Sequence, residues 1–127
     1  MKFEHFALNV PDARAHSRWY VEQLGFVVVR RREEAPYTHF LGDETGRVVV
    51  ELYTNPAAVV PDYAGAHPLC FHVAVVAVDA AAERARLERA GATFAFEDAL
   101  PDGSRLVMLR DPWGVPVQLC QRAAPLG

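Results

Sequence analysis

The chain lacks the long hydrophobic runs that carry proteins into or across membranes. Its 127 residues contain no uninterrupted apolar run near the ~20 residues that a membrane-spanning helix needs. A signal peptide needs an apolar stretch near the N-terminus, where this chain has the segment MKFEHFALN, which includes an acid and a histidine. We therefore expect a cytoplasmic protein with no membrane partner.

Cysteine and excess positive charge are also scarce. Only Cys70 and Cys120 are present, both in apolar segments, which predicts two buried thiols kept reduced. The formal net charge of -3 provides no basic surface, so nucleic acid is not an expected partner. At this length, with 51% hydrophobic residues, we expect one domain over residues 1–127 with a core that needs no disulfide.

What the chain does contain is an internal repeat. The segments EHFALNVPD and FHVAVVAVD each place a histidine second and an alanine two residues later, and each ends on aspartate. The shift from the first histidine to the second is 72 − 5 = 67 residues. The same shift relates three pairs of polar residues: His5 and His72, Asp12 and Asp79, and Glu51 and Gln118.

Both halves predict the same order of elements. A strand is followed by a helix that an aspartate caps and a glycine ends, and then by three short strands. The predicted first strands are Glu4–Val10 and Cys70–Val78, and the predicted helices are Asp12–Leu24 and Asp79–Ala90. This order predicts an α+β fold of two tandem βαβββ modules, about 1–54 and 69–122, joined by a Pro- and Ala-rich linker over about 55–68. Packed together, two such modules can form a curved mixed sheet around a cavity, with the helices outside.

The repeated polar residues predict a metal site in that cavity. Side chains alternate faces along a strand, so His5 and His72 lie on the face of smaller side chains in each first strand. Glu51 and Gln118 each interrupt an apolar strand, where a lone polar group is costly without a partner. Imidazole nitrogens with carboxylate and amide oxygens suit a divalent transition metal, with water completing the shell. A polar cluster without metal is the alternative interpretation.

Several motifs resemble the vicinal oxygen chelate superfamily, which includes glyoxalase I, bleomycin-resistance proteins and extradiol dioxygenases. They are HFALNVPD with a helix ending WYVEQLGF, the strand FHVAVVAVD, and the closing RDPWGVPVQL. In metal-dependent members the ligands come from the first and last strands of each module. The resemblance therefore implies His5, Glu51, His72 and Gln118 as ligands of a divalent ion, with zinc, nickel, iron, manganese and cobalt all open.

The resemblance also implies a small-molecule substrate, and members commonly form homodimers. The last ligand position is usually glutamate in glyoxalase-like members, whereas Gln118 cannot take up a proton. Glu51 is then the catalytic base of a lyase or isomerase of glyoxalase I type, acting through an enediolate on an unidentified substrate. An Fe(II) extradiol-type dioxygenase and a bleomycin-resistance-type binder without catalysis are the alternatives.

Other side chains are candidates for binding the substrate. Asn9 stands four residues after the first histidine, where glutathione-dependent glyoxalases typically have an arginine, and Tyr53 and Trp113 are candidate walls of the cavity. Arg14, Arg18 and the cluster Arg30–Arg32 are interpreted as solvated charges, with binding of an anionic tail as the alternative. His16, in the first predicted helix, is interpreted as an exposed polar residue.

Overall fold

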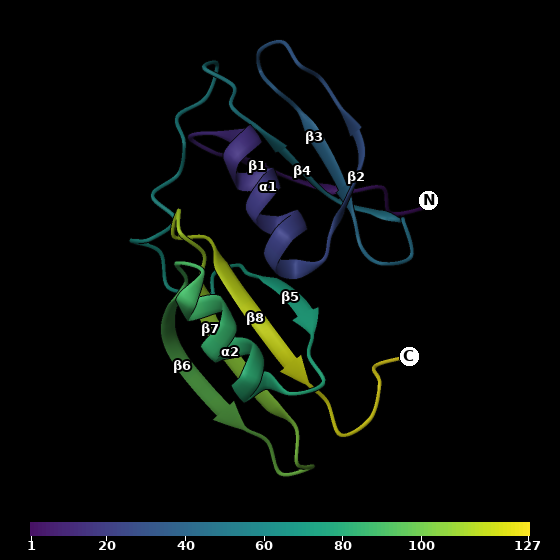
Figure 1. Cartoon of the computed structure of the whole chain (residues 1–127), viewed down its shortest axis with the longest axis vertical. Helices are drawn as coiled ribbons and strands as arrows, with labels where there is room; N and C mark the ends of the chain where they lie inside the picture. The colour runs from purple at the N-terminus through teal and green to yellow at the C-terminus, as the bar shows by residue number, and fades with distance from the viewer. The chain divides into compact units, whose positions relative to one another are not determined.

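The computed structural model describes all 127 residues, which form two helices and eight strands (Figure 1). In chain order the elements are β1 (Phe6–Asn9), α1 (Ala13–Leu24), β2 (Val27–Arg31), β3 (His39–Gly42), β4 (Val48–Tyr53), β5 (Val73–Val76), α2 (Ala80–Arg89), β6 (Thr93–Ala99), β7 (Arg105–Arg110) and β8 (Pro116–Gln121). The chain divides into two compact units, Met1–Pro61 and Asp62–Gly127, and the boundary falls inside the predicted linker. Each unit is βαβββ, which confirms the predicted α+β fold of two tandem modules.

The two sheets have the same topology and the same register. Their strand orders are β1-β4-β3-β2 and β5-β8-β7-β6, with the first strand of each module parallel to the last and the other neighbours antiparallel. Ala7 lies opposite Glu51 in the first parallel pair, and Ala74 lies opposite Gln118 in the second. The shift of 67 residues is therefore preserved in three dimensions at these positions.

A β-bulge absorbs one extra residue of the first module. The turn residues Asp43 and Asp111 are 111 − 43 = 68 apart, whereas Glu51 and Gln118 are 118 − 51 = 67 apart. The ladder between β3 and β4 skips Val49. This bulge accommodates the extra residue of the first module, so the rest of β4 stays in register. As a result Glu51 keeps the position that Gln118 has in the second sheet.

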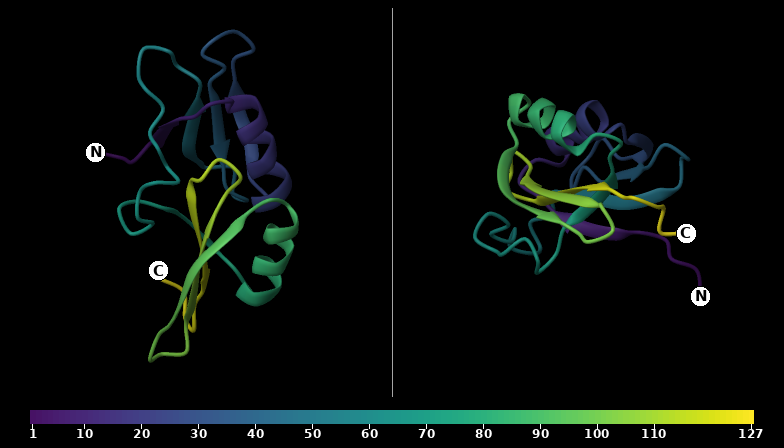
Figure 2. Two further views of the ribbon diagram at one scale, coloured as in Figure 1. Left: turned by 90° about the vertical axis from the view of Figure 1, so that its left-hand side faces the viewer. Right: turned by 90° about the horizontal axis from the view of Figure 1, so that it is seen from below.

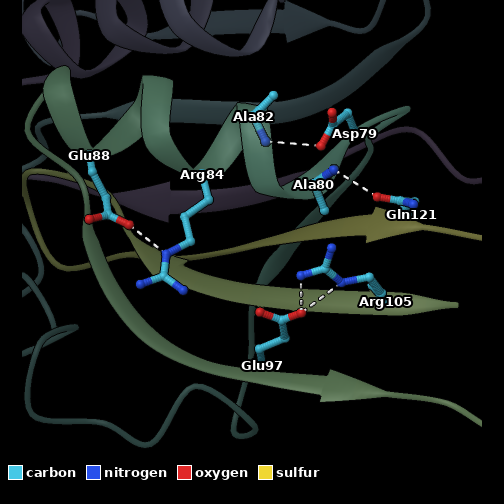
Figure 3. A network of polar contacts seen from close by, with 8 residues as sticks. All are labelled: Asp79, Ala80, Ala82, Arg84, Glu88, Glu97, Arg105 and Gln121. Atoms are coloured by element: carbon cyan, nitrogen blue, oxygen red, sulfur yellow. Dashed lines mark hydrogen bonds and ion pairs between the residues drawn. The ribbon is translucent and has the colours of Figure 1, made fainter.

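Both helices begin with the same pair of caps. The carboxylates of Asp12 and Asp79 accept hydrogen bonds from amide groups of the first helical turn. The first helical N–H donates to Thr54 Oγ1 at 2.8 Å in the first module and to Gln121 Oε1 at 2.9 Å in the second (Figure 3). Thr54 directly follows β4, and Gln121 is the last residue of β8. Each helix is therefore hydrogen-bonded to the end of the strand that carries the candidate ligand.

Each helix covers one face of its own sheet, and the apolar core of each unit lies between them (Figure 2). Leu8, Val10, Val50 and Leu52 are buried against α1 in the first unit. In the second unit the buried residues from α2 and the sheet include Val73, Leu87, Val107, Leu109, Val117 and Leu119. Burial of each such side chain stabilises a fold by about 1.5–3 kcal/mol. Neither helix has the length and apolar character that crossing a membrane requires.

The first strands are shorter than predicted, so His5 and His72 lie immediately before β1 and β5 instead of inside them. Upstream of β1, the next position on the neighbouring strand is the bulged Val49, which interrupts the ladder. Upstream of β5 the neighbouring position is Pro116, which has no amide hydrogen with which to extend the ladder. The predicted helices are each within two residues of the observed ones.

Two predictions about burial are wrong. Cys70 is exposed rather than buried, because the chain around it belongs to the loop that precedes β5, whereas Cys120 in β8 is buried as predicted. His16, interpreted as an exposed polar residue of the helix, is fully buried and packs edge-on against Tyr20 with 4.9 Å between ring centroids. The helical period places His16 on the same face of α1 as Ala13 and Tyr20, the face that packs on the sheet.

Candidate functional site

Strand β4 presents one carboxylate on the face of the first sheet that α1 leaves uncovered. Val50 and Leu52 are fully buried on the helix side, while Glu51 between them points to the other face with 17% of its side chain exposed. The alternation of the strand therefore separates an apolar face, which makes the core, from a polar one. Glu51 is accessible to a ligand and also sheltered from bulk solvent.

His5 meets Glu51 on this face, and both residues belong to the predicted set of four ligands. The His5 Nε2 atom lies 3.1 Å from Glu51 Oε2, and the His5 ring contacts the edge of Phe40 with 5.4 Å between centroids. The other ring nitrogen, Nδ1, lies 3.0 Å from Glu4 Oε1. Both ring nitrogens thus face carboxylates, which only accept hydrogen bonds. A ligand bound at Nε2 would replace the hydrogen that faces Glu51, while Glu4 accepts from Nδ1.

The His5 and Glu51 atoms have the spacing of two neighbouring metal ligands. Nitrogen and oxygen ligands lie about 2.0–2.2 Å from zinc, so two of them at right or tetrahedral angles are roughly 3.0–3.5 Å apart. The observed 3.1 Å lies within this range, and the donor types suit a divalent transition metal. Neither unit by itself gathers three or more His, Cys, Asp or Glu side chains that could hold a metal. The pair thus fits half of a coordination shell.

The second unit holds the other two predicted ligands in different surroundings. His72 is half-buried, and its Nδ1 lies 3.1 Å from the carbonyl oxygen of Pro68. A carbonyl accepts only, so this contact leaves Nε2 of His72 as the nitrogen for a ligand. Gln118 is buried in β8, and its Oε1 accepts a weak hydrogen bond from Cys120 Sγ at 3.3 Å. Burial raises the pKa of the Cys120 thiol, against an opposing effect of Arg122, so the thiol keeps its hydrogen for this bond.

Asn9 has a structural task in the first unit. Its side-chain nitrogen donates to the carbonyl oxygens of Asn55 and Ala58 at 3.0 and 2.9 Å, and its oxygen accepts from the Asn55 amide at 2.8 Å. The side chain is buried and holds the loop that follows β4. These bonds use both polar atoms of the amide, so a role in binding substrate, which the sequence suggested, would compete with them.

Tyr53 and Trp113 occupy different kinds of position. Tyr53 ends β4 two residues after Glu51, so both side chains lie on the same face, and it is half-buried. Trp113 is in the turn between β7 and β8, where its amide donates to Asp111 Oδ1 at 2.9 Å. Tyr53 is thus placed beside the His5–Glu51 pair, while Trp113 belongs to the second unit.

A row of side chains across the first sheet was missed in the sequence. The register places Arg30 opposite Phe40, and Phe40 opposite Glu51, so all three side chains lie on one face. The neighbouring Arg31 points to the opposite face, which divides the cluster Arg30–Arg32 between two surfaces. Strand alternation gives the signal for this division, but bulges in β2 and β4 hide the register from sequence analysis.

Comparisons with known proteins agree with this architecture. The family model described as the Glyoxalase/Bleomycin resistance protein/Dioxygenase superfamily matches residues 2–119. An uncharacterized protein of Bacillus subtilis strain 168, YwbC, is 28% identical over 130 residues, which is 95% of this chain and 98% of that protein.

Two solved structures illustrate the likeness of fold. TnmS3, an antibiotic binding protein from Streptomyces sp. CB03234, matches with a TM-score of 0.72 and 19% identity over 97% of both chains. A glyoxalase I variant from Zea mays matches with a TM-score of 0.72 and 23% identity, covering 97% of this chain and 46% of that one. At these identities the likeness concerns the fold.

Proposed function

Because this chain belongs to the Glyoxalase/Bleomycin resistance protein/Dioxygenase superfamily, we propose that it is a metal-dependent enzyme of glyoxalase I type. Its substrate is a small molecule with two oxygen atoms on adjacent carbons, and the reaction moves a proton between those carbons. The observation that carries this proposal is the His5–Glu51 pair, 3.1 Å apart on the uncovered face of the first sheet. His5, Glu51, His72 and Gln118 would hold the metal.

The four proposed ligands have two kinds of role: Glu51 is the base, and the others are neutral metal ligands. A bound divalent cation would polarise the substrate's carbonyl and stabilise negative charge that develops on its oxygens. Glu51 takes the proton from the carbon next to the carbonyl, and the electron pair of the broken C–H bond moves onto the carbonyl oxygen to give an enediolate. Glu51 then returns the proton to the former carbonyl carbon. The hydroxyl hydrogen passes to the enediolate oxygen, and the electron pair of that O–H bond forms the new carbonyl on the first carbon. Gln118 has no carboxylate, so this step belongs to the first module.

Two neighbours of Glu51 adapt the site to a substrate. The ring of Phe40 covers one side of the His5 imidazole, which limits the access of water to the Glu51 carboxylate. Arg30 is exposed on the same face, with Phe40 between it and Glu51. We assign Arg30 to a carboxylate or phosphate on the distal part of the substrate, because a guanidinium binds such groups in a bidentate manner.

Metal content tests the ligand set. We expect the purified protein, incubated in turn with zinc, nickel, iron(II), manganese and cobalt and then desalted, to retain at least one of them. His5→Ala and His72→Ala should each lose most of it, whereas His67→Ala, in the loop before β5, should retain it. Retention of no cation by the wild type would reject the metal-dependent enzyme in favour of a binding protein.

Proton exchange tests the base. A panel of α-hydroxy and α-keto carbonyl compounds is incubated in D2O with the metal-loaded protein, and loss of the C–H signal is followed by NMR. Glu51→Gln should slow this exchange by about 100-fold or more, the usual contribution of a positioned base. Glu44→Gln, an exposed carboxylate in the turn between β3 and β4, serves as the control. Full activity of Glu51→Gln would refute the role.

One observation favours a dioxygenase as the second candidate. His5, His72 and Glu51 make two imidazoles and one carboxylate, the ligand types of non-haem iron(II) oxygenases. Loading with iron(II) without oxygen, followed by addition of a catechol and air, separates the two activities. Oxygen uptake linked to catechol loss, with no C–H exchange in the panel above, would replace the isomerase with the dioxygenase.

We also propose that the protein is a homodimer. Strands β1 and β5 each form one of the two edges of their sheets, and unpaired edges with apolar side chains favour association. Val76 in β5 and Val78 after it are 85% and 94% exposed. Sedimentation equilibrium should give twice the chain mass of 14.1 kDa, and Val76→Lys should lower it to the chain mass. A wild-type protein that remains a monomer at about 100 µM would contradict the proposed homodimer.

A further inference from the structure

A hollow in the first unit lies on the opposite side of the sheet from Glu51. Its volume is about 290 Å³, and its lining comes from α1, β2, β3 and the segment after β2: Arg14, Ser17, Arg18, Val21, Val28, Arg31, Glu33 and His39. In the register, Arg31 pairs with His39 and His39 pairs with Leu52, so this row faces α1. The hollow, which we call the α1 cleft, is therefore separate from the face that carries Glu51.

Positive charge is concentrated in the α1 cleft of a chain whose net charge is -3. Three arginines line it, against the single carboxylate of Glu33. The Arg14 guanidinium lies over the Tyr37 ring, 4.1 Å from its centroid, which fixes its plane and leaves its N–H edge for other partners. Arg31 pairs with Glu33 at 2.7 Å, but both side chains are exposed, so this pair contributes little. Arg18 adds a third guanidinium from the middle of α1.

The floor of the cleft is built from buried polar groups. His39 is only 6% exposed, and its Nδ1 lies 2.7 Å from the carbonyl oxygen of Tyr37. Because a carbonyl accepts only, Nδ1 carries hydrogen and Nε2 is the ring nitrogen left for a ligand. The equally buried Ser17 brings a hydroxyl to the same lining. The cleft therefore has a polar floor, made of a hydroxyl and an imidazole nitrogen, beneath the arginines.

We propose that the α1 cleft binds the oxyanion group of a small ligand, a phosphate or a carboxylate. The arginines supply charge and forked N–H donors, and the Ser17 hydroxyl donates to an oxygen that reaches the floor. His39 Nε2 accepts the hydrogen of a protonated phosphate oxygen. A volume of about 290 Å³ is near the lower end of ligand pockets, which are roughly 300–1,000 Å³. The cleft thus accommodates a phosphate or a short dicarboxylate rather than a nucleotide.

NMR titration with inorganic phosphate and, separately, with malonate tests the proposal. We expect saturable shifts of the amides of α1, β2 and β3 for at least one anion, and the anion that saturates identifies the class of ligand. Arg18→Gln should weaken binding by about tenfold or more, the effect of losing a charge-assisted hydrogen bond. Arg18 is exposed on α1, so its replacement leaves the core intact.

Two controls make the outcome specific. Arg47→Gln removes the same charge from an exposed position in the turn between β3 and β4, outside the lining of the α1 cleft, and should leave the affinity unchanged. Glu51→Gln should also bind the anion normally, so failure of the proposed enzyme function leaves this result unaffected. Absence of saturation with both anions, or equal weakening by Arg18→Gln and Arg47→Gln, overturns the α1 cleft as a site.

Discussion

The turn before β8 gives a stability prediction with an internal control. Gly114 has a φ of 89°, and a Cβ added there would lie 2.8 Å from the Cβ of Ala64, 2.9 Å from its nitrogen and 3.0 Å from its Cα. Two of these three atoms are backbone. The Arg110 guanidinium holds this backbone in place by donating to the carbonyl oxygens of Tyr63, Ala66 and Gly114 at 2.8, 2.7 and 3.1 Å. The loop therefore cannot retreat without breaking those bonds.

The cost of Gly114→Ala has two parts. The left-handed backbone costs a residue with a Cβ about 1–2 kcal/mol, and overpacking adds about 1–3 kcal/mol. We expect a loss of about 2–5 kcal/mol in the free energy of unfolding, a large part of the ~5–15 kcal/mol typical of a domain. Gly46 occupies the corresponding turn before β4, with a φ of 77° and no atom within 4 Å of an added Cβ. Gly46→Ala should therefore cost only about 1–2 kcal/mol.

Urea unfolding followed by circular dichroism measures both losses. With a slope of about 1–3 kcal/mol per molar urea, a 3 kcal/mol loss lowers the midpoint by roughly 1–3 M. Adding Ala64→Gly to Gly114→Ala removes the 2.8 Å contact and should restore part of the difference. Equal midpoints for Gly46→Ala and Gly114→Ala would show that the contact between the added Cβ and Ala64 does not change the free energy of unfolding, contrary to this prediction.

Three further predictions concern Asn9 and the two cysteines. Asn9→Ala should lower the free energy of unfolding by about 1–3 kcal/mol and speed thermolysin cleavage near Asn55 and Ala58, because it removes the three hydrogen bonds between Asn9 and this loop. Unchanged cleavage would show that Asn9 does not hold the loop in place. Iodoacetamide at pH 8 should label exposed Cys70 in the native protein and Cys120 only in urea, since burial raises the pKa of the Cys120 thiol and keeps it neutral. The raised pKa of Cys120 also predicts that the free energy of unfolding decreases as pH rises above the ordinary thiol range, because the unfolded chain releases this proton more readily. Equal labelling rates of the two cysteines in the native protein would contradict the labelling prediction and this pH dependence.

The repeat made the architecture predictable, because the capping aspartates and the candidate ligands recur at one shift. The repeat also selected His5 and Glu51 as members of the candidate ligand set, and their side chains lie 3.1 Å apart. Which of Arg30 and Arg31 lies on the same face as Glu51 did not follow, because it depends on which residues of β2 and β4 bulge. A bulge shifts the register by one residue, which turns every later side chain to the other face. Such a shift depends on the pairing of distant strands and leaves no local pattern in the sequence.

The two modules have the same strand topology, but the side chains at their equivalent positions differ in charge and burial. The rows across the two sheets at the level of the candidate ligands are Arg30, Phe40 and Glu51 in the first, and Phe96, Met108 and Gln118 in the second. The first row is half-exposed and charged at both ends, whereas Met108 is fully buried and Gln118 nearly so. Burial of a carboxylate at the position of Gln118 would be costly, and an amide there avoids that cost. The proposed base, Glu51, thus stands where the sheet is open to a ligand, and the proposed neutral ligand, Gln118, stands where the side chains are buried.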